Sequence, residues 1–283
     1  MLGSPVSHSL SPALHLAAYE ALGLTWWRYE AIVCGEADLP AFLDSCGPDW
    51  IGLSLTMPLK RAVLPLLDRA QPLVTEVGAA NTVLFAAEQR LGYNTDAPGM
   101  ARALAQHATS EDLADPDKPA LILGGGATAC AALAALRDLG WRRVTVAVRN
   151  QARTTELGAA AARLAMSIEV TTLDPRVLGT AWMIISTLPA GAADGIARDI
   201  ARMEPAPKVV FDVVYHPWPT PLAEAASQAG AMVIGGFDLL LHQAALQVEL
   251  WTGRAAPVGE MRSAGLAELA RRQSGTMRPT LGK

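Results

Sequence analysis

The sequence predicts an α/β protein built from two domains with mainly parallel sheets, and three observations carry this prediction. The chain has 283 residues, which is enough for two domains of ordinary size. Hydrophobic residues make up 51% of the chain and charged residues 18%, a balance typical of proteins with buried parallel strands. Extended apolar segments alternate with helical segments along most of the chain, and this alternation favours parallel sheets covered by helices.

The first hundred residues already show the alternation. Ser11 and Pro12 suit the N-cap and first position of a helix that Gly23 ends. Further helices are expected at 37–46, 60–70 and 72–79, strands at 27–34 and 50–58, and a hairpin at 80–96 around Glu88-Gln89. These elements predict an N-terminal α/β domain with a mainly parallel sheet.

A second block begins near residue 98. A helix at 99–108 and a polar linker or loop at 109–119 precede "ALILGGGATACAALAALRDLGWRRVTVAVRN", which predicts a strand, a glycine-rich turn, a helix and a second strand. Later elements are a helix at 154–165, strands near 168–171, 181–187, 208–215 and 231–234, and helices at 237–253 and 258–273. We expect a nucleotide-binding domain at 98–236.

The glycine-rich turn fits the pattern G-x-G-x-x-A through Gly124, Gly126 and Ala129. A lone match is weak, but this one directly follows an apolar strand and opens a helix, as in Rossmann-type domains. Small residues let the backbone approach a pyrophosphate, whose charge then lies at the positive end of the helix. The alternative is that the glycines only allow tight packing of strand against helix.

The end of the second strand bears on the choice of nucleotide. Arg149 and Arg153 lie there, and no acidic residue occurs before Glu156. Guanidinium groups suit a ribose 2′-phosphate, whereas a carboxylate would suit the free 2′-hydroxyl of NAD. The residues therefore favour NADP, although either arginine could be an ordinary surface charge.

Composition excludes several other classes of protein. The net charge is −4 without a basic run, so no nucleic-acid or anionic-membrane partner is indicated. No stretch is apolar for long enough to span a membrane, and the first residues do not form a signal peptide. The three cysteines and five histidines lack metal-ligand spacing, so we expect no metal and a cytoplasmic protein.

Polar residues collect where strands of the first block end. They are Ser9, Ser11, Thr56, Lys60, Asn81, Thr82, Asn94 and Asp96. Each alone has an ordinary structural explanation, such as a helix cap, a turn or a solvated side chain. Together they indicate a pocket for a small polyhydroxylated substrate, because ligands of doubly wound sheets bind at the carboxyl ends of strands.

Seven segments, in order along nearly the whole chain, resemble motifs of the shikimate dehydrogenase family. They are "GSPVSHSLSPALH", "LTMPLK", "GAANTV", "GYNTDAPG", "LGGGATACA", "FDVVYHPWPTPL" and "GGFDLLLHQAALQVELWTG". The resemblance implies reversible NADPH-dependent reduction of 3-dehydroshikimate to shikimate. It also implies that the last helices return to the first domain, giving a substrate domain of 1–97 plus 237–283 and an NADP domain of 98–236.

The resemblance also implies roles for individual residues. Lys60 and Asp96 become the catalytic pair that handles the proton of the reacting hydroxyl, and which of them transfers it stays open. Ser9 and Ser11 are expected to bind the substrate carboxylate. The remaining substrate residues are Thr56, Asn81, Tyr215 and Gln243, and the cofactor residues are Gly124, Gly126, Ala127, Arg149, Arg153, Thr187, Val213 and Gly236.

The chain departs from the family motifs at Ser54, Ala127, Val148 and Leu239, and it begins where the first strand would end. One alternative is an NAD-dependent quinate/shikimate dehydrogenase, against which Ser11 and Arg149 argue. Another is a ligand sensor without turnover, which would be expected to lack Lys60 or Asp96. The sequence leaves a monomer or a homodimer open.

Overall fold

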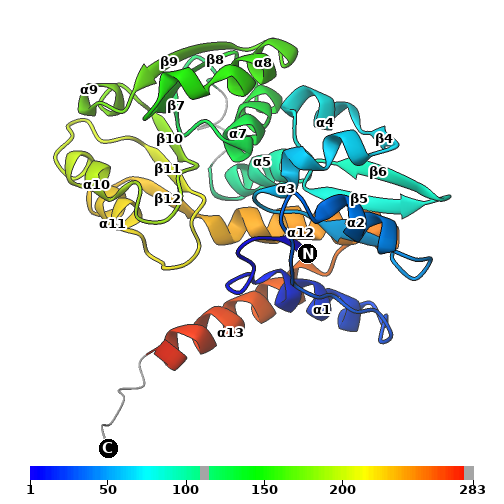
Figure 1. Cartoon of the computed structure of the whole chain (residues 1–283). Helices are drawn as coiled ribbons and strands as arrows, with labels where there is room; N and C mark the ends of the chain where they lie inside the picture. Colours follow the sequence, from blue (N-terminus) through cyan, green and yellow to red (C-terminus); the bar gives the residue numbers. More distant parts are fainter. Residues whose placement is uncertain (109–114, 277–283) are drawn as a thin grey trace, which may run out of the picture. The chain divides into compact units, whose positions relative to one another are not determined.

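The computed structural model describes residues 1–108 and 115–276, and the chain divides into two compact units (Figure 1). The first part of the predicted linker, 109–114, lies outside the described residues. The first unit comprises Met1–Arg69, Ala80–Thr95 and Ala244–Lys283, and the second comprises Ala70–Ala79 and Asp96–Gln243. The functional domain boundaries expected from the sequence stay predictions.

The second unit contains a six-stranded sheet in the order β12-β11-β10-β7-β8-β9. Every neighbouring pair in it is parallel. Its strands are β7 (Ala120–Leu123), β8 (Arg143–Val148), β9 (Ser167–Thr172), β10 (Met183–Ser186), β11 (Val209–Asp212) and β12 (Met232–Gly235). The α/β fold class and the parallel sheet are therefore confirmed.

Burial explains why these segments are strands. All residues of β7, β10 and β11 are buried, which a central strand covered on both faces requires. The edge strand β9 instead reads Ser-Ile-Glu-Val-Thr-Thr and has no buried residue. The composition of each of these strands therefore matches its central or edge position in the sheet.

The helices of the second unit lie around this sheet (Figure 1). Helix α7 (Ala127–Asp138) is alanine-rich and almost wholly buried, because small side chains let a helix approach the sheet closely. The other helices are α4 (Pro72–Val77), α5 (Asp96–His107), α8 (Thr155–Arg163), α9 (Pro175–Leu178), α10 (Asp194–Ile200) and α11 (Pro221–Gln228). Helices α9, α10 and α11 were not predicted from the sequence.

Two sheets are described in the first unit. Strands β1 (Leu2–Gly3) and β2 (Ile32–Val33) are parallel, and Leu2 also bridges Leu55 in parallel. The second sheet has the order β3-β5-β6-β4, with β3 (Gly52–Ser54) and β5 antiparallel. Among the described pairs of this unit, β1 pairs in parallel, whereas β3, β5 and β6 pair antiparallel. The mainly parallel sheet predicted for the N-terminal domain is therefore corrected to mixed pairing, because the hairpin contributes antiparallel strands.

The hairpin consists of β5 (Thr82–Ala86) and β6 (Gln89–Tyr93). In the sheet, β6 neighbours β4 (Arg69–Ala70), which is the edge strand. Its turn residues are Ala87 and Glu88, one position before the predicted turn. Both have positive φ, of 48° and 61°, which is the conformation that two-residue hairpin turns favour.

Helices of the first unit are α1 (Ser11–Ala21), α2 (Leu39–Ser45), α3 (Leu59–Ala62) and α13 (Val258–Thr276), with the short 3-10 helix η1 (Leu64–Leu66). Helix α12 (Gly236–Thr252) begins in the second unit and ends in the first. Helix α1 packs against α13, as seen in Figure 1.

Three local predictions in this unit were wrong in detail. The helix expected at 60–70 breaks into α3 and η1, because Pro65 lacks the N–H that a continuous helix needs. The strands expected at 27–34 and 50–58 shorten to β2 and β3. Ser11 lies inside α1 and does not cap it.

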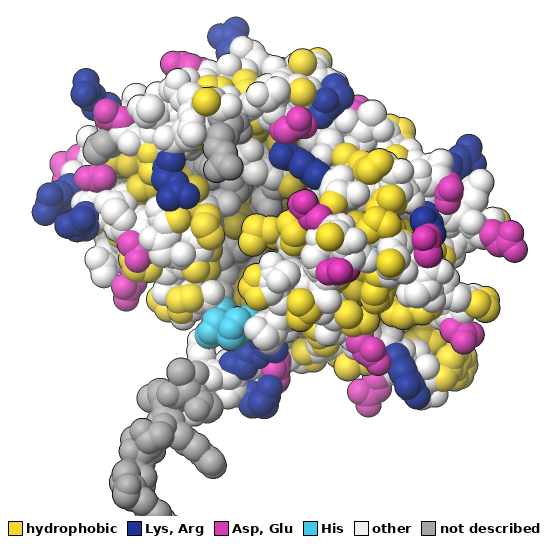
Figure 2. Space-filling view, viewed as in Figure 1, with side chains coloured by type: hydrophobic (Ala, Val, Ile, Leu, Met, Phe, Trp, Pro, Cys, Tyr) yellow, Lys and Arg dark blue, Asp and Glu magenta, His cyan; other side chains and the backbone are white. Residues whose placement is uncertain are grey.

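The surface carries charges of both signs. On the face shown in Figure 2, Lys and Arg side chains lie interspersed with Asp and Glu side chains, as the small net charge of −4 leads one to expect. No helix within 1–108 and 115–276 is both long and apolar enough to cross a membrane.

Candidate active site

The turn after β7 requires glycine at its first position. Gly124 has φ of +110°, and a Cβ there would lie 2.6 Å from Oγ1 of Thr187. That hydroxyl donates to the carbonyl oxygen of Leu123 at 2.8 Å. The predicted cofactor residues Gly124 and Thr187 therefore lie against each other.

The start of α7 has the features of an anion-binding site. Gly126 precedes the helix, and no side chain caps its first N–H groups. A Cβ on Gly126 would meet no atom within 4 Å, so the space beside this residue is open. Because Ala127 begins a helix of 12 residues, uncapped N–H groups and the helix dipole favour a phosphate here. The turn therefore fits a dinucleotide.

The end of β8 carries no carboxylate. Val148 is buried and Arg149 is exposed, and the side chain of Asn150 accepts a hydrogen bond from the Ala152 N–H at 3.0 Å. The side chain of Arg153 lies outside the described part of the chain. Arg149 is thus available to a ribose 2′-phosphate, whereas no acidic group stands where NAD would need one.

Two other predicted cofactor residues lie close together. The N–H of Val213 donates to Ser186 at 3.0 Å, which extends the pairing of β10 and β11. A Cβ on Gly236 would collide with the carbonyl oxygen of Val213, so the backbone approach of these two segments requires glycine. This contact ties the end of β11 to the start of α12.

Tyr215 and Gln243 are the predicted substrate residues in the second unit. Tyr215 is half-buried, and Gln243 is 8% exposed. The side-chain N–H of Gln243 donates to the carbonyl oxygen of Leu240 at 2.9 Å. Gly99 makes room for Gln243, since a Cβ on Gly99 would lie 2.9 Å from its backbone nitrogen.

The remaining substrate residues, with Lys60, belong to the first unit. The segment that carries Thr56 and Lys60 is fixed through its backbone: the Thr56 N–H donates to Leu2 at 2.9 Å, and the Lys60 carbonyl accepts from Ala80 at 2.8 Å. Both side chains are half-buried. These hydrogen bonds fix the backbone from which the Lys60 side chain extends, even though α3 is short.

Asn81 is buried at the centre of a polar cluster. Its side-chain oxygen accepts from the Thr95 N–H at 2.8 Å and from the Thr82 hydroxyl at 2.9 Å, and its amide donates to the Thr95 hydroxyl at 2.8 Å. Thr95 directly precedes Asp96, the first residue of α5, which is 6% exposed. The Asn81 side chain therefore helps to fix the backbone next to Asp96.

Gln247 completes this cluster, and it was not among the residues predicted from the sequence. Its side-chain oxygen accepts from the Ser54 hydroxyl at 2.8 Å, and its nitrogen donates to the Thr82 hydroxyl at 2.9 Å and to the Asn81 carbonyl at 3.3 Å. Gln247 is 1% exposed. One amide thus joins "LSLTMPLK" to "GAANTV". Its spacing of four from Gln243 on one helix was the only available signal.

Aromatic residues lie on the other side of Ser54. The Tyr29 hydroxyl and the Ser54 hydroxyl lie 2.6 Å apart, and burial raises the pKa of Tyr29. The ring of His15 stacks on Tyr29 at 4.0 Å, and its Nδ1 donates to the Ser11 carbonyl at 2.9 Å. Complete burial lowers the pKa of His15 to about 3, so this imidazole is neutral.

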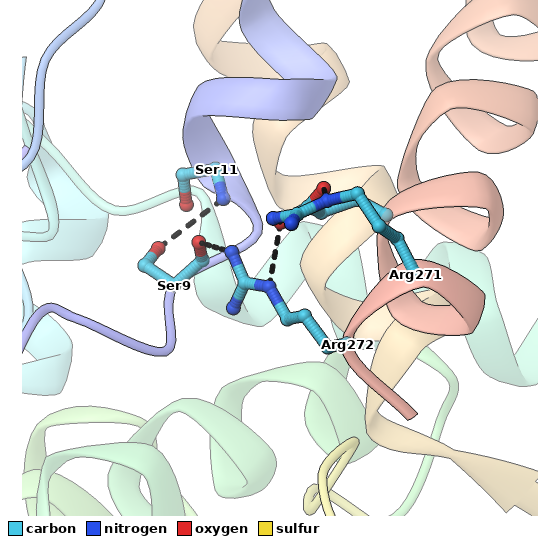
Figure 3. A network of polar contacts seen from close by, with 5 residues as sticks. Ser9, Ser11, Arg271 and Arg272 are labelled. Atoms are coloured by element: carbon cyan, nitrogen blue, oxygen red, sulfur yellow. Dashed lines mark hydrogen bonds and ion pairs between the residues drawn. The ribbon is translucent and has the colours of Figure 1, made fainter. Parts of the chain in front are cut away.

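Ser9 and Ser11 lie side by side at the start of α1 (Figure 3). The Ser11 N–H donates to the Ser9 hydroxyl oxygen at 3.2 Å, so the Ser9 side chain supports the first turn of the helix. The Ser9 carbonyl accepts from Arg272 of α13 at 3.1 Å. The structure therefore brings the two predicted carboxylate ligands together.

A cavity of about 630 Å³ in the first unit has a different lining. Its lining includes the aromatic side chains of Trp26, Trp27, Trp50 and Trp251. None of the predicted site residues is among its lining residues. In the part of the chain that the structure describes, no cluster of His, Cys, Asp or Glu could hold a metal ion.

The sheet order and the open glycine turn define the second unit as a dinucleotide-binding domain of the doubly wound α/β class. Comparison with known families gives a narrower assignment. The family model "Shikimate dehydrogenase substrate binding domain" matches residues 1–83, and "Shikimate 5'-dehydrogenase C-terminal domain" matches residues 236–264.

Full-length relatives agree with these matches. The "Shikimate dehydrogenase (NADP(+))" of Geobacter metallireducens is 37% identical over 286 residues, covering 96% of both chains. That of Symbiobacterium thermophilum is 32% identical, covering 95% of this chain and 93% of the relative. The chain belongs to the shikimate dehydrogenase family.

Solved structures of the family are also similar. The shikimate dehydrogenase of Mycobacterium tuberculosis has 41% identity and a TM-score of 0.84, covering 94% of this chain and 97% of that one. The Thermus thermophilus enzyme, solved in complex with NADP(H) and shikimate, has 32% identity and a TM-score of 0.79, with coverage of 94% and 97%.

Proposed function

We propose that this protein catalyses the reversible NADP-dependent reduction of 3-dehydroshikimate to shikimate. The observation that carries the proposal is full-length similarity to NADP-dependent shikimate dehydrogenases in a chain that keeps both Lys60 and Asp96. The product places the enzyme in the shikimate pathway of aromatic amino-acid biosynthesis.

NADP is the proposed cofactor. Gly124, Gly126 and Ala127 are proposed to hold its pyrophosphate at the start of α7, where the helix is uncapped and the space is open. Arg149 and Arg153 are proposed to hold the 2′-phosphate. Thr187, Val213 and Gly236 are proposed to line the nicotinamide site. When bound, the nicotinamide supplies the hydride chemistry.

Lys60 and Asp96 are the proposed catalytic pair. When shikimate is oxidised, its reacting hydroxyl must lose a proton, and one of the pair accepts it; in the reverse direction the proton returns to the carbonyl oxygen. A carboxylate partner keeps the lysine positioned and favours its charged form. The buried Asn81–Thr95 contacts support this proposal, because they fix the backbone that leads into Asp96.

Substrate binding is proposed to involve the carboxylate and the ring hydroxyls of the substrate. Ser9 and Ser11 donate hydroxyl hydrogen bonds to the carboxylate, and further residues contact the ring hydroxyls. Those further residues are Thr56, Asn81, Tyr215 and Gln243. Because the Asn81 side chain already bonds Thr95 and Thr82, we propose that it contributes mainly by holding the site in shape.

The proposed domain organisation follows these roles. Residues 1–97 plus 237–283 form the substrate domain, and residues 98–236 form the NADP domain. The three free cysteines suit a reducing compartment, and we place the reaction in the cytoplasm. The proposed assembly is a monomer or a homodimer.

Initial rates with NADP⁺ and NAD⁺, each paired with shikimate and quinate, test the proposal. We expect fast turnover only with NADP⁺ and shikimate. The quinate dehydrogenase of Corynebacterium glutamicum in complex with NAD is also a structural relative, at 27% identity and a TM-score of 0.77. Comparable rates with NAD⁺ or quinate would favour that second function. Binding of shikimate without turnover of any pair would indicate a sensor.

A further inference from the structure

The Arg272 side chain of helix α13 contacts the predicted carboxylate-binding segment. The guanidinium of Arg272 donates from Nη2 to the backbone carbonyl of Ser9 at 3.1 Å, although the two residues lie 263 positions apart. The Arg272 side chain is 23% exposed, so this contact is largely shielded from water. Figure 3 shows the guanidinium placed between α13 and the start of α1.

Glu268 orients this guanidinium. Its Oε1 accepts from Nε of Arg272 at 2.7 Å, one helical turn away. Arg271 binds both oxygens of Glu268 at 2.7 Å. Bonds from Arg271 and Arg272 lower the pKa of Glu268 to about 2, so the carboxylate stays charged at any working pH. The guanidinium plane of Arg272 is therefore fixed before it meets Ser9.

Fixing the Ser9 carbonyl has a consequence for the two hydroxyls. The Ser9 hydroxyl oxygen is held by the Ser11 N–H at 3.2 Å, and the Ser11 carbonyl is held by His15 at 2.9 Å. Arg272 supplies the contact that joins this segment to α13. Without it, the Ser9 peptide would lose its charge-assisted hydrogen bond and could rotate.

We propose that Arg272, oriented by Glu268, is a positioning residue that sets the geometry of the Ser9–Ser11 segment for binding the substrate carboxylate. The proposal rests on the proposed function, since it concerns the same substrate. It assigns to α13 a role in substrate affinity, while hydride and proton transfer are left to other residues.

Kinetics of Arg272→Ala test the proposal. Loss of one charge-assisted hydrogen bond predicts that the KM for shikimate rises about 5- to 20-fold. The kcat should change by less than about twofold, and the KM for NADP⁺ should not change. Arg272→Lys should recover part of the affinity, because an ammonium can reach one partner but cannot bridge both.

Arg271→Ala is the matched control. Arg271 lies on the same helix and pairs with the same carboxylate, but it is 73% exposed, and within the described part of the chain its hydrogen bonds go to Glu268. We expect its KM for shikimate to stay within about twofold of the wild-type value, as is usual for exposed ion pairs. An equal rise in both variants would overturn the assignment to Arg272.

The methyl ester of shikimate separates positioning from general damage. The ester lacks the carboxylate charge, so its hydrogen bonds from Ser9 and Ser11 are weaker, and its calorimetric Kd should rise less in Arg272→Ala than the KM for shikimate does. An unchanged KM for shikimate, or a parallel loss for shikimate, the ester and NADP⁺, would contradict the proposal. If the wild-type protein shows no turnover, the proposed function fails, and the calorimetric Kd for shikimate in the two proteins still tests Arg272.

Discussion

Replacing Gln247 by Met should destabilise the first unit by about 2 kcal/mol. The side chains are similar in size, so the change removes hydrogen bonds and leaves little cavity. Three bonds are lost: to Ser54 at 2.8 Å, to Thr82 at 2.9 Å and to the Asn81 carbonyl at 3.3 Å. At about 1 kcal/mol each, they amount to about 3 kcal/mol.

The partners that remain reduce this figure. The Asn81 carbonyl still accepts from the Leu55 N–H at 2.7 Å. The Ser54 hydroxyl can turn and donate to the Tyr29 hydroxyl oxygen, which lies 2.6 Å away, and the Tyr29 hydroxyl can then donate to its other side-chain partner, Ser11. Because no buried donor is left without an acceptor, the full desolvation penalty does not apply, and about 2 kcal/mol is expected.

Urea unfolding, followed by the fluorescence of the tryptophans, measures the change in the free energy of unfolding. Gln273→Met is the control, because Gln273 is exposed on α13 and its replacement should cost less than about 0.5 kcal/mol. A double-mutant cycle with Ser54→Ala should give a coupling of about 1 kcal/mol. Additive effects, or a loss equal to that of the control, would refute the role of this amide.

Three further predictions concern the site and its support. Lys60→Ala should lower kcat by about 10²- to 10⁴-fold while the calorimetric Kd for NADP⁺ stays unchanged, and unaltered turnover would remove the lysine from the chemistry. Arg149→Ala should raise the KM for NADP⁺ about tenfold and leave that for NAD⁺ unchanged; an equal effect on both would exclude a 2′-phosphate contact. The pKa of His15 is about 3 in the folded state and 6.5 at its ordinary value. As the pH falls, the unfolded chain therefore binds a proton at this histidine before the folded chain does, and stability is lost from about pH 6.5 towards pH 3. His15→Gln should remove about 1.4 kcal/mol per pH unit of that slope in urea unfolding, and identical slopes would contradict a buried neutral imidazole.

Much of the second unit could be predicted from the sequence. Its central strands β7, β10 and β11 are short, mainly apolar runs, and the glycine turn after β7 marks the first crossover. The short helices α9 and α10 were missed, because four and seven residues give too few turns for a periodic signal. In the first unit, β1 and β2 are only two residues long, so pairing partners define them more than composition does.

The supporting residues of the candidate site were harder to find. Gly124 was predicted from the glycine-rich turn and Gly236 from the family resemblance, and the structure adds the positive φ and the close backbone approach that require glycine at these positions. Gln247 and Arg272 were not predicted, since their contacts with Ser54 and Ser9 span 193 and 263 positions. Such contacts form only in the folded chain, and no local sequence pattern predicts them. Family motifs identify the residues that contact a substrate more readily than they identify the residues that position those contacts.

The most direct test of the account is the stoichiometry of one reaction. Purified protein is mixed with shikimate and NADP⁺, and the shikimate consumed, the NADPH formed and the 3-dehydroshikimate formed are measured together. We predict that the three amounts are equal and that, over the same initial-rate interval, all three are about 10²- to 10⁴-fold lower in Lys60→Ala. NADPH without 3-dehydroshikimate, or no consumption of shikimate at all, would contradict the proposed activity.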